Sequence, residues 1–213
     1  MKTTDLVILG AGGFGREVLS QLKDTCHSYN ILGFIDDTPE LKGATVSGIP
    51  VLGGIDKLKY SSQPFNVVIA IGNSNARKKI YEDIRMNSNL IFPNIIMDGV
   101  KISDSVRMGQ GCIICYSNIL TVDIEIGDFV VINLDCTVGH DAKLLDYVTL
   151  YPSVNVSGNV TIGQLTEVGT GVNIIQGKMI GEKTIIGAGS VVVQSLPDNC
   201  TAVGAPAKPI KYH

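Results

Sequence analysis

One histidine of the chain, His140, is followed directly by an acidic residue, Asp141. Histidine is suited to remove or return a proton near neutral pH, because its ordinary pKa is about 6.5. A neighbouring carboxylate can orient the ring and stabilise its charged form. The pair therefore has the composition of a general base for an amine or hydroxyl, and the alternative is a solvated surface histidine. The other histidines, His27 and His213, stand in a polar stretch and at the last position, and we expect both to be solvated.

A glycine cluster, GAGGFG at residues 10–15, is the second stretch that could do chemistry. It follows an apolar run and opens a helical pattern, and Asp36 and Asp37 come about twenty residues later, as in the fingerprint of dinucleotide sites. Glycines let backbone N–H groups approach a diphosphate, whose charge a helix N-terminus favours. These features fit NAD, a nucleotide sugar, or a tight turn without a ligand. The segment is too short for two mononucleotide-binding halves, which argues against NAD.

The five cysteines predict neither a disulfide framework nor a metal site, because their number is odd and they are scattered. Cys112 and Cys115 form a C-x-x-C pair, but no second cysteine pair or histidine pair accompanies it, so we expect no metal. Cys112 and Cys136 fall at small positions of the repeat described below, and we expect both in the core.

The elements that must position these residues divide the chain into two parts. In residues 1–88, strand-like runs such as DLVILG and NVVIAIGN alternate with helical patterns such as ARKKIYEDIRM. This alternation predicts a small α/β, Rossmann-like domain with a parallel sheet. Farther on, an aliphatic residue recurs at every sixth position without an insertion. The positions are Ile102, Met108, Ile114, Leu120, Ile126, Ile132, Val138, Leu144, Leu150, Val156, Ile162, Val168, Ile174, Ile180, Ile186 and Val192.

A six-residue period is typical of a parallel β-helix, in which three units form a coil of roughly eighteen residues. The aliphatic residues point into the prism and stack on those of neighbouring coils. We therefore expect a β-helix over residues 89–205 and a C-terminal tail over residues 206–213. His140 is the third residue of its unit, counted from Val138, so we expect it at a bend or on the outer surface.

The composition argues against several classes of function. The chain has 213 residues and a net charge of -3, with scattered charges, so nothing in it suggests a nucleic-acid partner. It has no apolar run long enough to span a membrane. The first residues are too polar for a signal peptide, and we expect a cytoplasmic protein.

The hexapeptide repeat, together with the motifs GAGGFGRE, FIDD, IAIGN, GHD and VGAPAKPI, resembles the hexapeptide acyltransferases. Within them it resembles the subgroup that contains the nucleotide-amino-sugar N-acetyltransferases of bacillosamine and perosamine synthesis and the sialic acid O-acetyltransferases. The resemblance covers essentially the whole chain. It implies a left-handed β-helix, acetyl-CoA as co-substrate, and a homotrimer whose donor groove lies between neighbouring prisms.

The resemblance also implies roles for individual residues. His140 matches the catalytic base, Asp141 the acid that strengthens it, and Asn133 a position near the acceptor sugar. The further matches are Gly12, Gly13 and Phe14 at the diphosphate of a uridine-diphosphate sugar, Asp36 and Asp37 near its nucleoside, and Thr149, Thr170 and Ala188 along the acetyl-CoA groove. Lys208 and Lys211 either contact the CoA phosphates or solubilise the end of the chain.

We therefore expect an acetyl-CoA-dependent N-acetyltransferase that acts on a nucleotide-linked 4-amino-sugar by direct transfer, without an acetyl-cysteine intermediate. The nearest alternative is O-acetylation of a sugar such as sialic acid. An NAD-dependent oxidoreductase is supported by the glycine cluster alone. A non-catalytic β-helix scaffold or carbohydrate-binding module is disfavoured by the GHD motif and the α/β domain.

Overall fold

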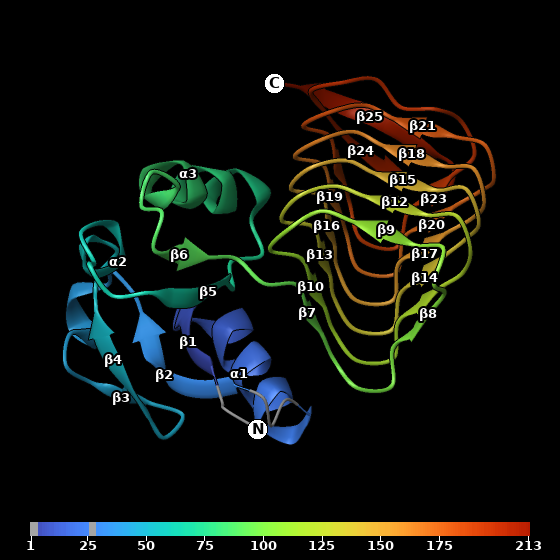
Figure 1. Cartoon of the computed structure of the whole chain (residues 1–213). Coiled ribbons are helices and arrows are strands. Elements are labelled where there is room, and N and C mark those ends of the chain that lie inside the picture. Colours follow the sequence, from blue (N-terminus) through green and yellow to red (C-terminus); the bar gives the residue numbers. More distant parts are fainter. Residues whose placement is uncertain (1–3, 26–28) are drawn as a thin grey trace.

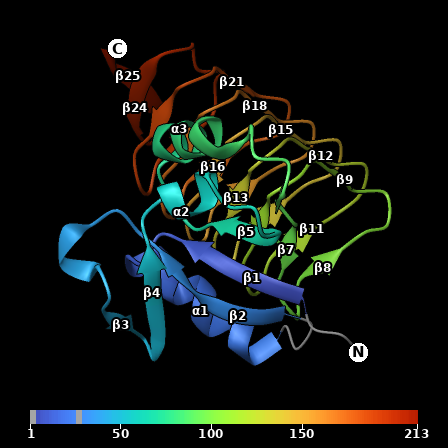
Figure 2. The ribbon, with the colours of Figure 1, turned by 60° about the vertical axis from the view of Figure 1, so that its left-hand side comes forward.

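The computed structural model describes residues 4–25 and 29–213. Two regions lie side by side: an α/β domain, called here the N-terminal domain, and a three-sided stack of coils, called the prism (Figure 1). Figure 2 shows the sheet of the N-terminal domain beside the early coils of the prism, with the C-terminus at the opposite end of the stack. His27, which we expect to be solvated, lies outside the described residues.

The N-terminal domain is built on one sheet with strand order β3-β4-β2-β1-β5-β6. All neighbours in it are parallel except β3 and β4, which form an antiparallel pair. The strands are β1 (Thr4–Leu9), β2 (Tyr29–Ile35), β3 (Thr45–Val46), β4 (Ile49–Gly53), β5 (Phe65–Ile69) and β6 (Leu90–Ile91). The helices are α1 (Gly13–Thr25), α2 (Asp56–Lys59), α3 (Ser74–Ile84) and a 3-10 turn, η1 (Pro39–Leu41).

Alternating side chains of β1 cover the two faces of this sheet. Leu6 and Ile8 pack with the apolar residues of α1, whereas Val7 and Leu9 pack with those of α2 and α3. The strand β6 pairs with β5 although it lies beyond residue 88, so the sheet of the first domain extends past the boundary that we expect from the sequence.

The prism has three faces, each a sheet of mostly two-residue strands that pair in parallel, except for the antiparallel pair at the end of face 1. Face 1 contains β7 (Ile95–Ile96), β10 (Ile113–Ile114), β13 (Val131–Ile132), β16 (Thr149–Leu150), β19 (Glu167–Val168), β22 (Ile185–Ile186), β24 (Cys200–Gly204) and β25 (Ala207–Tyr212). Face 2 contains β8 (Lys101–Ile102), β11 (Ile119–Leu120), β14 (Thr137–Val138), β17 (Asn155–Val156), β20 (Asn173–Ile174) and β23 (Val191–Val192). Face 3 contains β9 (Arg107–Met108), β12 (Glu125–Ile126), β15 (Lys143–Leu144), β18 (Thr161–Ile162) and β21 (Met179–Ile180).

The six-residue period corresponds to the core of the prism. The recurring aliphatic residues from Ile114 to Val192 are buried in one cluster, and Ile102 and Met108 pack against its end. Because equivalent residues of adjacent coils are 18 apart in sequence, a bend in one coil lies directly over the bend of the previous one. The expected fold class, a small α/β domain followed by a parallel β-helix, is confirmed.

The last residues form an element of the prism instead of a free tail. β25 pairs antiparallel with β24 and closes face 1 at the C-terminal end. His213 is exposed, and its Nε2 lies 3.0 Å from the hydroxyl oxygen of Thr201.

A buried arginine, Arg77 on α3, joins the N-terminal domain to the prism. Its Nε donates a hydrogen bond of 2.9 Å to the carbonyl oxygen of Phe129, and its Nη2 donates one of 2.8 Å to that of Tyr147. Its Nη1 donates to the carbonyl oxygens of Ile71 and Gly72 at 2.6 and 2.9 Å. Burial lowers the pKa of Arg77 to about 10, against the opposing effect of the Glu167 carboxylate, so the guanidinium remains charged at neutral pH.

Candidate active site

His140 and Asp141 form the bend between β14 on face 2 and β15 on face 3. The Nδ1 atom of His140 lies 2.7 Å from Oδ2 of Asp141, and the two side chains are 53% and 60% exposed. Asp141 has a φ of 59°, a left-handed conformation that aspartate tolerates better than most residues. The pair therefore lies on the surface of the prism, at a bend, as its place in the repeat predicts.

The contact with Asp141 decides which ring nitrogen is available. When Nδ1 carries the proton and donates it to the carboxylate, Nε2 keeps its lone pair and can accept a proton from another molecule. The backbone beneath the ring is also fixed, because Asn159 N donates to the carbonyl oxygen of His140 at 2.7 Å and Asp141 N donates to that of Val122 at 3.2 Å. This arrangement is chemically suited to general-base catalysis.

A polar pocket of about 260 Å³ adjoins Asp141. Its lining includes two cations, Arg107 and Lys143, and the carboxylates of Asp123 and Glu125. Lys143 Nζ lies 3.1 Å from Glu125 Oε2. Charged groups of both signs thus surround the acidic member of the pair.

The glycine cluster forms the turn between β1 and α1. Gly10 has a φ of 104°, and its N–H donates to the carbonyl oxygen of Ile35 at 2.8 Å. A Cβ at Gly15 would lie 1.8 Å from the carbonyl oxygen of Gly10, so this position excludes any side chain. Above Gly12 and Gly13, in contrast, a Cβ would meet nothing within 4 Å. The start of α1 therefore presents open backbone, while Phe14 is half-buried against the core of the N-terminal domain.

Asp36 and Asp37 line a pocket of about 280 Å³ at the carboxyl ends of β1 and β2. Both oxygens of the Asp36 carboxylate accept backbone hydrogen bonds, Oδ2 from Ala11 at 2.7 Å and Oδ1 from Thr38 at 2.9 Å. Burial alone would raise the pKa of Asp36, but the hydrogen bonds from Thr38 and Ala11 outweigh it and lower the pKa below its ordinary value of 3.8. Asp36 thus holds the glycine turn in place. Asp37 Oδ1 accepts from Ile55 N at 2.8 Å.

Asn133 and Tyr151 occupy equivalent places, one coil apart, where face 1 turns toward face 2. Asn133 is 9% exposed, and its Oδ1 accepts from Leu134 N at 2.7 Å. The Tyr151 ring lies about 3.8 Å from the position that a Cβ of Gly72 would take, in the loop after β5. The bend that carries Asn133 therefore lies close to the carboxyl edge of the N-terminal sheet.

Thr149 is not where the sequence predicts it. Its side chain is 1% exposed, and its hydroxyl donates to the carbonyl oxygen of Gly72 at 2.7 Å and accepts from Arg77 Nη2 at 2.9 Å. The outward position of β16 is covered by the N-terminal domain, so this hydroxyl holds the two domains together and cannot line a donor groove.

Thr170 and Ala188 are exposed at the bends that lead from face 1 to face 2. They lie one coil apart, and Gly189 N donates to the carbonyl oxygen of Thr170 at 2.8 Å. His140 occupies the bend that leads from face 2 to face 3. His140 and the expected donor residues therefore border the two opposite edges of the same face 2.

The residues that sequence reasoning missed are those that attach the loop after β5 to the prism. Glu167 Oε1 accepts hydrogen bonds from Asn73 Nδ2 at 2.8 Å and from Ser74 N at 2.8 Å, and Glu167 Oε2 accepts from the Tyr151 hydroxyl at 3.1 Å. The carboxylate thereby satisfies N–H groups at the start of α3, where negative charge is favoured. Asn73 before a helical pattern is a recognisable capping signal, but nothing local indicates its partner in the prism.

The described thiols lie in the core. Burial raises the pKa of Cys112 and Cys115 to about 12 and that of Cys136 to about 11. Since the thiolate is the nucleophile, these side chains are unsuited to carry an acyl group. Within residues 4–25 and 29–213, no group of three or more His, Cys, Asp or Glu side chains could hold a metal ion.

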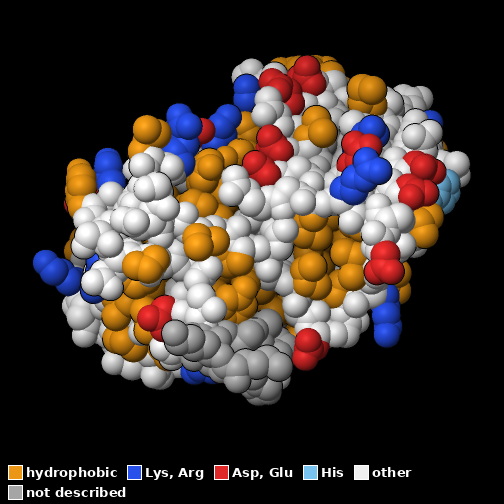
Figure 3. Space-filling model, viewed as in Figure 1, with side chains coloured by type: hydrophobic (Ala, Val, Ile, Leu, Met, Phe, Trp, Pro, Cys, Tyr) orange, Lys and Arg blue, Asp and Glu red, His pale blue; other side chains and the backbone are white. Residues whose placement is uncertain are grey.

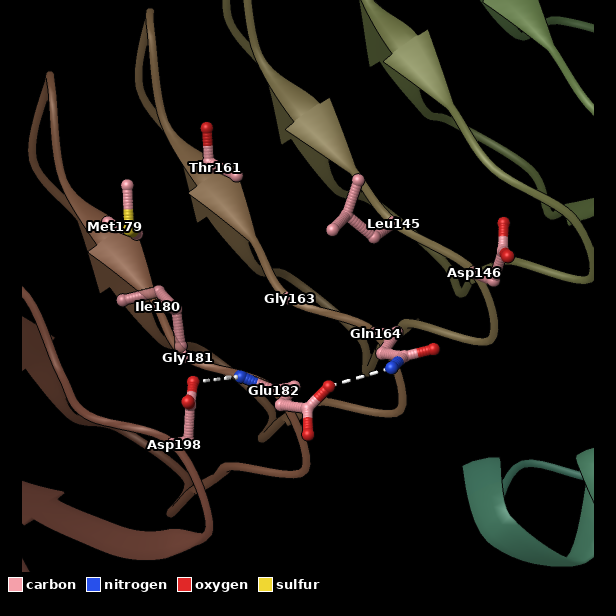
Figure 4. A pocket seen from close by; sticks show the side chains of 10 residues that line it. All are labelled: Leu145, Asp146, Thr161, Gly163, Gln164, Met179, Ile180, Gly181, Glu182 and Asp198. Carbon is pink, nitrogen blue, oxygen red and sulfur yellow. Dashed lines mark hydrogen bonds between the residues drawn. The ribbon is translucent and has the colours of Figure 1, made fainter.

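A further pocket of about 390 Å³ lies on face 3, toward the C-terminal coils (Figure 4). Gln164 Nε2 donates to Glu182 Oε2 at 2.7 Å, and Glu182 N donates to Asp198 Oδ1 at 2.8 Å. None of the site residues expected from the sequence lines it.

The surface in Figure 3 carries charges of both signs, spread over that side of the molecule. No helix of the described segments is long and apolar enough to cross a membrane.

Comparison with known proteins agrees with this architecture. Residues 5–84 match the family model of the PglD N-terminal domain. The GDP-perosamine N-acetyltransferase of Escherichia coli O157:H7 is 34% identical over 174 residues, which are 77% of this chain and 75% of that protein. The chain belongs to the hexapeptide-repeat acetyltransferase family.

Solved structures of other acetyltransferases share the fold over the full chain. PerB from Caulobacter crescentus, in complex with CoA and GDP-perosamine, has a TM-score of 0.88 at 31% identity and covers 97% of both chains. The acetyltransferase domain of PglB from Neisseria gonorrhoeae has a TM-score of 0.90 at 32% identity and covers 98% of this chain and 100% of that one. That domain has also been solved with acetyl coenzyme A.

The comparisons confirm that the chain is an acetyltransferase. The nucleotide sugar bound to PerB carries guanosine diphosphate, whereas the resemblance of the sequence led us to expect uridine diphosphate for this chain. The glycine turn could not have separated the two, since both nucleotides present the same diphosphate to the backbone.

Proposed function

We propose that the chain transfers the acetyl group of acetyl-CoA to the amino group of a nucleoside-diphosphate-linked 4-amino-sugar, with His140 as general base. The observation that carries the proposal is the 2.7 Å contact between His140 Nδ1 and Asp141 Oδ2 at an exposed bend of the prism. It leaves Nε2 free to accept a proton from the acceptor. The resemblance to GDP-perosamine N-acetyltransferases supports the amino-sugar as acceptor.

The reaction requires a proton to leave the acceptor as the new bond forms. An amine attacks the thioester carbonyl, Nε2 of His140 takes a proton from the nitrogen, and the tetrahedral intermediate collapses with cleavage of the C–S bond. CoA leaves as the thiolate and receives a proton, and the products are an N-acetylated sugar and free CoA. Asp141 orients the imidazole and stabilises its protonated form during the transfer.

The N-terminal domain is the proposed binding site of the nucleotide portion. The open backbone over Gly12 and Gly13 suits a diphosphate, and the pocket bordered by Asp36 and Asp37 suits the nucleoside. Asn133 lies at the neighbouring bend of the prism, where the sugar would extend. Since acetyl-CoA and nucleotide sugars are cytoplasmic metabolites, the cytoplasm is the expected location of the reaction.

A homotrimer is part of the proposal, because the proposed base and the proposed donor residues lie on opposite edges of one face of the prism. His140 borders one edge of face 2, whereas Thr170 and Ala188 border the other. A rotation about an axis parallel to the prism carries the His140 edge of one chain to the Thr170 edge of the next, and three copies close the ring. Light scattering should give three times the chain mass of 22.7 kDa; a fully active monomer would contradict the shared site.

The test of function is release of free CoA from acetyl-CoA in the presence of a panel of acceptors. The panel contains GDP-linked and UDP-linked 4-amino-sugars, the same sugars without nucleotide, and sialic acid. We expect release with at least one nucleotide-linked amino-sugar and a far lower rate with the free sugar. Preferential turnover of sialic acid would show that the chain is an O-acetyltransferase, a reaction in which the same base could act.

A further inference from the structure

The imidazole of His140 leans over a residue of the next coil that has no side chain. That residue is Gly158. A Cβ built on Gly158 would lie 2.5 Å from Nε2 and 2.6 Å from Cε1 of His140, closer than real side chains approach. The ring therefore occupies the volume that a side chain at position 158 would fill.

Among the coils around His140, only this one lacks a side chain at the corresponding corner. The equivalent residues at the same corner are Val122 one coil below and Gln176 and Gln194 farther above, and all three have side chains. The backbone of Gly158 does not adopt the left-handed conformation that favours glycine, so alanine fits the main chain there. The methyl group of an alanine at this position would instead displace the imidazole of His140.

Two other contacts hold His140 in place, one to the ring and one to the backbone. Asp141 holds Nδ1 at 2.7 Å, and the hydrogen bond from Asn159 N fixes the carbonyl group of His140 at 2.7 Å. Adjacent coils are about 4.8 Å apart, so a ring that leans onto the next coil carries its far nitrogen toward the C-terminal part of the prism. Thr170 and Ala188, the exposed donor residues of the proposed function, lie in that part.

We infer that Gly158 is a positioning residue for the base. Because position 158 has no side chain, the imidazole can lie against the next coil. In that position Nε2 is placed to take the proton from the acceptor amine. The inference rests on the proposed role of His140 and adds a requirement at a second position. A misplacement of a catalytic group by about 1 Å can reduce turnover by about a hundredfold.

The test is the substitution Gly158→Ala, with CoA release measured under saturating and limiting concentrations of each substrate. We expect kcat to fall by about 10- to 100-fold, because the methyl group pushes the ring upright, while the KM values of both substrates change by less than about twofold. The matched control is Val122→Ala, which alters the exposed neighbour on the opposite side of His140 and should leave kcat within about twofold.

His140→Ala separates the failure of this inference from the failure of the proposed function. If His140→Ala is impaired and Gly158→Ala has the parent kcat, the positioning role of Gly158 is overturned and the base remains. If His140→Ala itself turns over at the parent rate, both the base and the positioning residue are overturned.

A second measurement does not depend on activity. The melting temperature of Gly158→Ala is compared with that of the parent, and the same comparison is made in a His140→Ala background. Because the added methyl group collides with the ring, the substitution should lower the melting temperature when His140 is present and leave it unchanged when the ring is absent. An equal loss in both backgrounds would overturn the inference.

Discussion

The hydroxyl oxygen of Ser74 lies 2.9 Å from Oε1 of Glu167, across the boundary between the N-terminal domain and the prism. The same hydroxyl lies 3.0 Å from the carbonyl oxygen of Leu165, so its single hydrogen is shared between these two acceptors, and Ser74 is fully buried. Together with Arg77, these contacts hold the loop after β5 against the prism. In the proposed function the acceptor sugar meets the prism beside this loop, so these contacts between the two domains would set its position.

The first prediction concerns Arg77. Arg77→Met removes the donors of several buried carbonyl oxygens and should lower the free energy of unfolding by at least about 3 kcal/mol, since each unpaired buried group costs about 1–3 kcal/mol. Denaturant unfolding measures the loss. Lys79→Met, an exposed cation on the same helix, is the control and should change stability by less than about 0.5 kcal/mol. Equal stabilities of the two variants would show that the buried cation is dispensable.

The second prediction concerns Thr149. Thr149→Val keeps the shape of the side chain but loses the hydrogen bonds to Gly72 and Arg77, and it should cost about 1–2 kcal/mol of stability without changing the KM for acetyl-CoA. In contrast, Ala188→Trp adds bulk at an exposed bend of the proposed donor groove. It should raise that KM by about tenfold, which corresponds to about 1.4 kcal/mol, and leave stability nearly unchanged. If Thr149→Val raised the KM for acetyl-CoA and Ala188→Trp lowered only the stability, Thr149 would belong to the donor site after all.

The third prediction concerns Asp36 and pH. Its folded-state pKa lies below the ordinary value of 3.8, so the carboxylate contributes stability above pH 4 that is lost as the pH falls through the folded-state pKa. Asp36→Asn should therefore lower the melting temperature at pH 7, and the difference from the parent should shrink at pH 3. Thermal melts at both values test this. A difference that is equal at pH 7 and pH 3 would mean that the charge of Asp36 does not stabilise the glycine turn.

The fourth prediction concerns the buried thiols. Because burial raises the pKa of Cys112 and Cys115 to about 12, both should resist iodoacetamide in the native protein at pH 8 and react after denaturation. Peptide mass spectrometry reads out each site separately. Cys112→Ala should keep kcat within about threefold, since direct transfer needs no acyl-cysteine. Trapping of an acetyl group on Cys112 would contradict direct transfer.

The sequence predicts the prism well because each coil repeats the same physical requirement. Every sixth residue must fill the interior, so the aliphatic period locates the core from Ile114 to Val192. The same repeat predicts that His140 lies at a bend. Local pattern was sufficient for these features.

Features that depend on the partner domain could not be predicted in the same way. The outward residues of face 1 would be exposed in an isolated prism, but the N-terminal domain covers Ile113, Val131 and Thr149. The acceptors of Arg77 lie up to 72 residues away in sequence, so its burial has no local signal. β6 lies beyond the expected boundary at residue 88 because it completes the sheet by pairing with β5.

The most direct test of the central claim is the rate of CoA release by His140→Ala with acetyl-CoA and a GDP-linked 4-amino-sugar. Removal of a general base should lower kcat by about 10²- to 10⁴-fold while the melting temperature and the oligomeric state stay those of the parent, because the side chain is half exposed. A folded His140→Ala protein that releases CoA at the parent rate would contradict the claim that this imidazole takes the proton.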